Sequence, residues 1–228
     1  MKRITMLLLS ALILMFFCSC EKGNDADSSE NKDTQTSSIN EPAVAANAKA
    51  HSTEVVGGVT YIDGILIVNK TYSLPKDYNY GLTDETMEAF TKMKQAAAED
   101  GIPLEIVSGF RSYEKQKALY EEYTKEHGKK EADTFSARPG YSEHQSGLAM
   151  DINNADFSTI GSKDMEWLAE HCTEYGFIIR FPKGKENITG YSYEPWHIRY
   201  VGKDIAKDIK KKNLCLEEYL GVTSKYQD

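Results

Sequence analysis

Two polar segments about forty residues apart constrain the folding of this chain more than any other feature. The first is Ser142-Glu-His-Gln-Ser-Gly-Leu-Ala-Met-Asp151, and the second is Glu194-Pro-Trp-His197. Both place imidazole and carboxylate side chains among apolar residues, and these are ligand types that zinc prefers. A fold in which both segments supply ligands to one metal ion must bring them close together. The sequence therefore predicts a metal site assembled from distant parts of the chain.

Local geometry is compatible with such a site. His144 is expected in a loop and Asp151 on the strand that follows, so the backbone can fold back and bring both to one ion. Glu194 and His197 have opposite parity in a regular strand and would face opposite sides. Pro195 resists helix and ladder pairing, so a bulge or turn there can aim both side chains inward. Three ligands would then hold the metal, and one carboxylate would remain to accept a proton from water.

The other three histidines show fewer signs of being metal ligands. His51 lies in a low-complexity segment, His127 at the end of an expected helix, and His171 within another beside Trp167. Imidazoles at helix ends commonly interact with the helix dipole for structural reasons. We therefore predict that these three are not ligands.

The N-terminus is typical of an exported protein. Two basic residues precede an apolar run over residues 4–17, which is too short for an ordinary membrane-spanning helix. The run ends in Phe17-Cys-Ser-Cys20, so residues 1–20 resemble a bacterial lipoprotein-type signal segment, in which Cys20 would become the lipidated first residue of the mature chain. Plain secretion or an uncleaved anchor is the alternative. We expect an extracytoplasmic protein that is anchored to the membrane by lipid, or is secreted if Cys20 is not lipidated.

Residues 21–52 are predicted to form a disordered tether, because they contain no aromatic residue and too little apolar surface to offset their chain entropy. Residues 53–228 are long enough for one domain with a real core. The formal net charge of -8 makes nucleic acid an unsuitable partner. Cys172 and Cys215 remain after the tether, and the sequence allows either a disulfide or two buried thiols.

The domain is predicted to be α+β, because its strands and helices do not alternate as in a parallel βαβ fold. Asp63-Gly64 between two β-branched runs predicts a hairpin within residues 55–70. Thr83 and Ser112 are expected to cap helices, and residues 125–142 to form a long polar loop. Further strands are expected at 104–107, 147–153, 177–181 and 196–201, and further helices from 162 or 164 and from about 203.

The motif residues together resemble the zinc D-Ala-D-Ala carboxypeptidase family, and most closely its VanY-type D,D-carboxypeptidases and the related L,D-carboxypeptidases. The resemblance rests on Ser142-x-His-x-x-Gly-x-x-x-Asp151 and Glu194-x-x-His197, with Ser108-Gly-Phe-Arg111-Ser upstream. It implies a hedgehog/D-Ala-D-Ala peptidase-like fold, with helices packed on a central antiparallel sheet around a zinc cleft. It also implies peptidoglycan stem peptides as the substrate and Zn²⁺ as the cofactor.

The resemblance further implies a role for each matching residue. Its zinc ligands correspond to His144, Asp151 and His197. Glu194 matches the catalytic base, and Arg111 matches an arginine that would stabilise the developing oxyanion. Gln116 and Ser142 match substrate-binding residues. Simple structural roles remain the alternatives for the last three: Arg111 would pair with a carboxylate, Gln116 would lie on the surface, and Ser142 would belong to a turn.

The expected function is hydrolysis of the C-terminal D-alanine from a stem peptide. A murein endopeptidase of the same fold and a non-catalytic cell-wall binding module are the alternatives. A serine D,D-peptidase is a poorer match. Ser112-x-x-Lys115 and Ser73-x-x-Lys76 are present, but the Lys-Thr-Gly element of that class is absent from the sequence.

Overall fold

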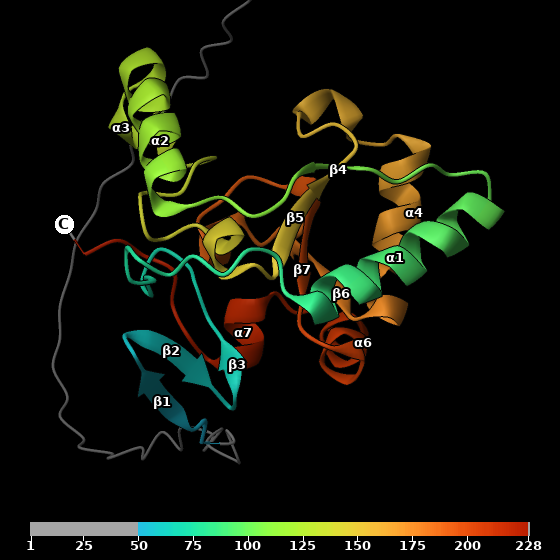
Figure 1. Cartoon of the computed structure of the whole chain (residues 1–228), viewed down its shortest axis with the longest axis horizontal. Helices are drawn as coiled ribbons and strands as arrows, with labels where there is room; N and C mark the ends of the chain where they lie inside the picture. The colour runs from blue at the N-terminus through green and yellow to red at the C-terminus, as the bar shows by residue number, and fades with distance from the viewer. Residues whose placement is uncertain (1–49, 228) are drawn as a thin grey trace, which may run out of the picture. The chain divides into compact units, whose positions relative to one another are not determined.

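A computed structural model describes residues 50–227 (Figure 1). The predicted signal, Cys20 and most of the predicted tether lie outside these residues. At the end of the tether, His51 and Ser52 both bond to the Asp63 carboxylate, at 2.9 Å from the ring Nδ1 and 2.9 Å from the Ser52 backbone nitrogen. Within residues 50–227, no helix combines the length and the apolar character needed to cross a bilayer.

A small antiparallel sheet opens the described chain. Its strands, in spatial order, are β1 (Thr53–Val56), β2 (Val59–Ile62) and β3 (Ile65–Leu66). Asp63 and Gly64 both have positive φ, as a type I′ hairpin turn requires, so the predicted hairpin is confirmed. A second turn at Gly57-Gly58 divides the preceding β-branched run into β1 and β2, which the sequence analysis had left as one run.

The larger sheet carries the candidate site. Its four strands are antiparallel, and their spatial order is β4 (Ile106–Ser108), β5 (Ala149–Ile152), β7 (Glu194–Tyr200) and β6 (Phe177–Phe181). Figure 1 shows β5 and β7 adjacent in its middle. The predicted α+β class with a central antiparallel sheet is confirmed.

Strand β7 departs from regular pairing at its N-terminal end. Ile198 pairs with Ile179, but Glu194 pairs with Phe181, so two extra residues of β7 lie between these pairs. This irregularity contains Pro195, which has no N–H to donate to a ladder. The predicted bulge at Glu-Pro is therefore present.

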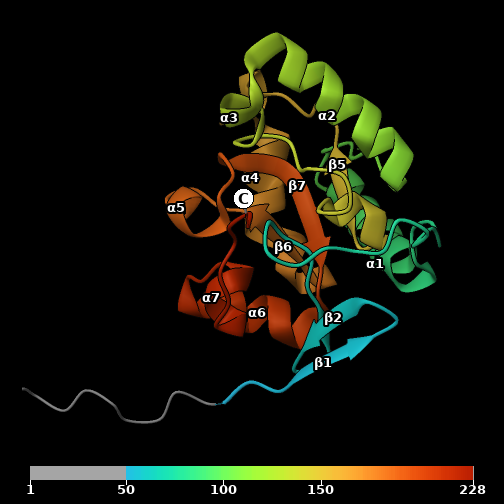
Figure 2. The same cartoon turned by 90° about the vertical axis from the view of Figure 1, so that its left-hand side faces the viewer.

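Helices surround the larger sheet, and Figure 2 shows α6 and α7 next to each other. The α-helices of the described chain are α1 (Asp84–Glu99), α2 (Tyr113–His127), α3 (Lys129–Ala132), α4 (Lys163–His171), α5 (Glu186–Thr189), α6 (Lys203–Lys212) and α7 (Leu216–Leu220). Three short 3₁₀ helices are η1 (Glu143–Ser146), η2 (Phe157–Thr159) and η3 (Cys172–Tyr175). The segment predicted as a long polar loop after residue 125 instead contains the end of α2 and all of α3.

The main core lies between the sheet, α1 and α4. Helix α1 contributes Phe90, Met93 and Ala97, which pack with Met150 of β5 and other apolar residues. Thr83 and Ser112 cap α1 and α2 as predicted, because their hydroxyls accept bonds from backbone N–H groups one turn on.

The two cysteines of the domain are both buried free thiols. Of the two possibilities that the sequence left open, the structure therefore favours separate thiols over a disulfide between Cys172 and Cys215.

Candidate metal centre

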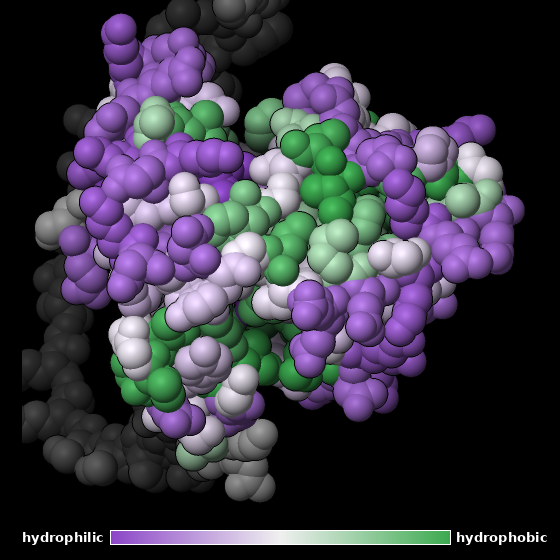
Figure 3. Space-filling model, in the orientation of Figure 1, coloured by the Kyte–Doolittle hydropathy of each residue, from purple (hydrophilic) through white to green (hydrophobic). Residues whose placement is uncertain are grey.

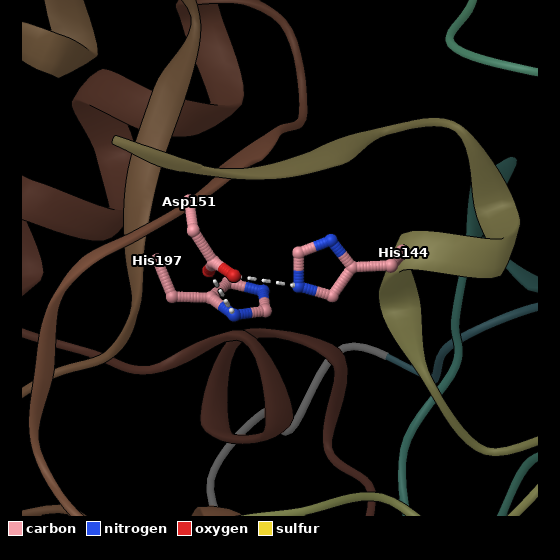
Figure 4. A group of neighbouring side chains, drawn as sticks. All are labelled: His144, Asp151 and His197. Carbon is pink, nitrogen blue, oxygen red and sulfur yellow. Dashed lines mark ion pairs between the residues drawn. The ribbon is translucent and has the colours of Figure 1, made fainter. Parts of the chain in front are cut away.

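Three buried side chains from three elements converge: His144 from η1, Asp151 from β5 and His197 from β7 (Figure 4). His144 Nε2 lies 3.3 Å from Asp151 Oδ2, and His197 Nδ1 lies 3.3 Å from Asp151 Oδ1. One ligand atom from each residue lies within 4.8 Å of the other two. The structure thus brings together the three predicted ligands.

The donor set fits a zinc ion. Two nitrogen or oxygen ligands about 2.0–2.1 Å from a tetrahedral zinc ion lie about 3.3–3.4 Å from each other. The distance from His197 Nδ1 to Asp151 Oδ1 has this value, and one ligand atom from each of the three residues lies within 4.8 Å of the others. Asp151 Oδ1 is buried and has no hydrogen-bond partner among residues 50–227, so it is an oxygen that a cation would satisfy.

Backbone pairing sets the positions of two ligands. Asp151 and His197 are direct partners in the β5–β7 ladder, so their side chains lie beside each other on one face of the sheet. His144 reaches the same point because Gly147 ends η1 in the left-handed conformation, at φ 74°, and turns the chain into β5. A Cβ atom at Gly147 would lie 2.0 Å from the carbonyl oxygen of Gly81, so only glycine fits this turn.

Glu194 lies beside the cluster, with Oε2 3.5 Å from His197 Nδ1. The β7 bulge places Glu194 and His197 on the same side, which regular alternation would not allow. Burial raises the pKa of the Glu194 carboxyl above its ordinary value, although the nearby His197 opposes this shift. A carboxylate of raised pKa is suited to take up and release a proton near neutral pH.

The pKa of the Asp151 carboxyl is shifted in the opposite direction to that of Glu194. Burial alone would raise the pKa of its carboxyl, but His144 and His197 outweigh burial and hold the pKa well below the ordinary value. Burial lowers the pKa of His144, which favours the neutral imidazole that a metal requires.

Arg111 faces the same point from the turn that precedes α2. Its Nη2 lies 3.8 Å from Asp151 Oδ2 and donates to Ser108 Oγ at 2.7 Å, and its Nη1 donates to Gln116 Oε1 at 2.9 Å. Gln116 is fully buried, and its Nε2 donates to the Ala137 carbonyl oxygen at 2.7 Å. The surface position that was the alternative for Gln116 is therefore wrong. In this structure Gln116 supports Arg111 and does not line the cavity.

A cavity of about 480 Å³ opens onto the cluster, and both Arg111 and Ser142 line it. Its lining also includes Phe135, Ala137 and Tyr141, together with Asn154 and Phe157. Figure 3 shows apolar side chains gathered in the middle of this face, near the place of β4 in Figure 1. The lining thus combines the polar cluster with exposed apolar side chains, such as those of Val107 and Phe157.

Glu143 is a residue of the site that the sequence analysis missed. Its Oε1 accepts hydrogen bonds from Arg180 Nε at 2.8 Å and from Arg199 Nη1 at 2.7 Å, and all three side chains are buried. Burial alone would raise the pKa of the Glu143 carboxyl, but the two guanidinium groups hold it far below the ordinary value. A sequence signal existed: Arg180 interrupts the otherwise apolar strand β6, and a buried cation needs a partner.

The chain matches the model of the VanY family, described as D-alanyl-D-alanine carboxypeptidase, over residues 79–203. This protein belongs to that family of carboxypeptidases, as its motifs predicted. A curated relative, the D-alanyl-D-alanine carboxypeptidase of Enterococcus faecalis, is 38% identical over 174 residues, which cover 68% of this chain and 65% of that protein. The chain thus spans slightly less than two thirds of that relative's length.

Solved structures of similar proteins share the fold. The LD-carboxypeptidase LdcB, whose structure was described as revealing the basis of peptidoglycan recognition, has a TM-score of 0.71 and 44% identity, covering 77% of this chain and 98% of LdcB. A variant of the vancomycin-resistance D,D-pentapeptidase VanY in complex with Zn(II) has a TM-score of 0.61 and 37% identity, covering 68% of this chain and 97% of VanY. The predicted D-Ala-D-Ala peptidase-like fold is therefore confirmed.

Proposed function

We propose that this protein is a zinc-dependent carboxypeptidase that releases the C-terminal D-alanine of peptidoglycan stem peptides. The observation that carries the proposal is the buried cluster of His144, Asp151 and His197, with Glu194 beside it and a cavity in front. The Zn(II) complex of VanY and the peptidoglycan recognition described for LdcB support the choice of metal and substrate class.

Each residue then has a defined task. His144, Asp151 and His197 would hold the ion, which would polarise the scissile carbonyl and lower the pKa of a water molecule. Glu194 accepts the proton of the attacking water as the new C–O bond forms. It then donates this proton to the departing amine as the C–N bond breaks, so that free D-alanine leaves. Arg111 donates to the oxygen that gains negative charge.

Defined tetrapeptide and pentapeptide stems test the proposal. The purified protein is incubated with each stem, with and without a chelator, and the products are identified by mass. We expect loss of one terminal alanine, abolished by the chelator and restored by zinc. Cleavage of a cross-bridged dimer without release of an amino acid would indicate an endopeptidase instead. Zinc binding without cleavage of any substrate would indicate a binding module.

The Glu194→Gln variant tests the role of the base. The amide cannot take a proton from water, so turnover should fall by about 10²–10⁴-fold. Zinc content should stay near one ion per chain, since Glu194 is not a ligand in this assignment. Substantial activity of the variant would refute the role of Glu194, and loss of zinc would show that Glu194 is a ligand.

We further propose that the protein is exported and anchored to the membrane by lipid at Cys20. The proposal rests on the N-terminal sequence alone. Cells grown with labelled palmitate should label the wild-type protein and not the Cys20→Ser variant. A wild-type protein that carries no label would contradict the anchor.

A further inference from the structure

Glu143 precedes the predicted ligand His144, yet its carboxylate lies against the other histidine, His197. Glu143 Oε2 is 3.8 Å from His197 Nε2. Both atoms are buried, and neither has a hydrogen-bond partner among residues 50–227. Two unsatisfied polar atoms of complementary type thus face each other across a gap slightly longer than a hydrogen bond.

The other nitrogen of His197 faces the cluster. His197 Nδ1 lies 3.3 Å from Asp151 Oδ1 and 3.5 Å from Glu194 Oε2, so this is the atom that would bind the ion. An imidazole nitrogen needs a free lone pair to bind a metal, and the proton of a neutral ring must then be on the other nitrogen. For His197 that nitrogen is Nε2, which faces Glu143.

The other histidine of the cluster already has an equivalent partner. His144 Nδ1 lies 2.8 Å from the carbonyl oxygen of Gly109, while its Nε2 faces Asp151. Ligating histidines commonly donate their second N–H to a carbonyl or carboxylate, which fixes the ring and its tautomer. Glu143 is the acceptor that completes this pattern for His197.

The surroundings of Glu143 fix its orientation. Arg180 Nε and Arg199 Nη1 both donate to the same oxygen, Oε1, and this leaves Oε2 directed at the imidazole. Arg180 is itself held by Glu217 of α7 through two bonds of 2.8 and 2.6 Å. Arg199 also donates to the Leu66 carbonyl oxygen at 2.6 Å, so neither guanidinium is free to move away.

We propose that Glu143 is a positioning residue of the metal centre: its carboxylate accepts the Nε2–H of His197 and thereby presents Nδ1 to the ion. The proposal rests on the zinc site proposed above. Arg180 and Arg199 keep the carboxylate in place.

The Glu143→Gln variant gives a sharp test, because the two arginines are donors only. They require an oxygen at the Oε1 position, so the NH₂ group of the introduced amide must face His197. A donor at that place favours a lone pair on Nε2 and a proton on Nδ1, where the ion should bind. Zinc affinity should therefore fall about 10–100-fold, which is the usual effect of removing such a partner.

Glu217→Gln is the matched control. Glu217 is another buried carboxylate of the same network, and it bonds to Arg180 and Asn69. Among residues 50–227 it forms no hydrogen bond or ion pair with His144, Asp151 or His197. Both variants remove one negative charge from the same pair of arginines. If the lost charge acted only by weakening the packing around the arginines, zinc affinity would fall in both variants. Loss of the His197 contact occurs only in Glu143→Gln.

The measurement is competition for zinc between each full-length protein and a chromophoric chelator, with the unfolding of each metal-free protein followed in parallel. A loss of tenfold or more in Glu143→Gln, with less than about threefold in Glu217→Gln, supports the proposal. Equal losses in the two variants would overturn it while leaving the zinc site intact. A wild-type protein that binds no zinc would instead overturn the proposed function and this proposal with it.

A second measurement does not depend on the folding of any variant. In a crystal structure of the zinc-loaded wild-type protein, the distance from His197 Nε2 to Glu143 Oε2 should shorten to about 2.7–3.2 Å. A distance still beyond 3.5 Å, or a different acceptor on Nε2, would overturn the proposal.

Discussion

Replacing Gly147 by alanine should destabilise this protein more than the same change at other glycines of positive φ. The φ of Gly147 is 74°, a conformation that costs an L-residue about 1–2 kcal/mol. The new Cβ would lie 2.0 Å from the backbone oxygen of Gly81, which no side-chain movement can relieve. Forcing extra atoms into a packed site costs about 1–3 kcal/mol more. We therefore expect a loss of about 2–5 kcal/mol in the free energy of unfolding.

Gly101 provides the matched control. It also has positive φ, at 76°, but its added Cβ would meet no atom within 4 Å. Gly101→Ala should therefore lose only the conformational part, about 1–2 kcal/mol. Urea denaturation of the metal-free proteins, followed by circular dichroism, gives both values.

The same substitution should also affect the metal centre. Gly147 separates η1 from β5, and its carbonyl accepts a bond from the Thr83 backbone N–H at 3.1 Å. Movement of this turn would shift His144 relative to Asp151, so zinc affinity should fall in Gly147→Ala and not in Gly101→Ala. Equal losses of stability in the two variants would refute the argument from close contact.

Three further outcomes follow from the structure. Burial raises the pKa of Glu194, and the proposed general base works only when it is ionised. D-alanine release should therefore fall as the pH drops through a value above 4.5, and a kcat/KM profile that stays flat down to pH 4.5 would contradict this. Gln116→Ala should leave Arg111 without one acceptor and lower kcat/KM at least about tenfold, while zinc affinity stays near the wild-type value, both measured on the same preparation. Burial raises the pKa of Cys172 to about 12 and that of Cys215 to about 11, so iodoacetamide at pH 8 should modify neither until urea is added, as judged by peptide mapping.

Local signals explain why several elements could be predicted from the sequence. Thr83 and Ser112 each have the side chain that a helix N-terminus needs, and Asp63-Gly64 has the residues that a tight hairpin needs. The Glu-Pro pair at Glu194 likewise predicted an irregular strand. Each of these signals depends only on a few neighbouring residues.

Long-range packing explains what could not be predicted. Glu143 meets Arg180 and Glu217 meets Arg180 across 37 residues in each case, and no local pattern pairs them. Helix α1 shows the same limit: the polar residue Thr86 is buried, whereas the apolar residue Met87 is exposed. In both cases, the burial and the partners of a side chain depend on which distant parts of the chain pack against it.

The electrostatic arrangement at His197 favours a metal site over a simple buried ion pair. Asp151 and Glu194 both lie within 3.5 Å of His197 Nδ1, and one N–H cannot satisfy two carboxylates fully. Their environments also push their pKa values apart, down for Asp151 and up for Glu194. Such a separation distinguishes an ionised group from one that exchanges a proton. This separation supports the proposed roles of Asp151 as a metal ligand and of Glu194 as the proton acceptor.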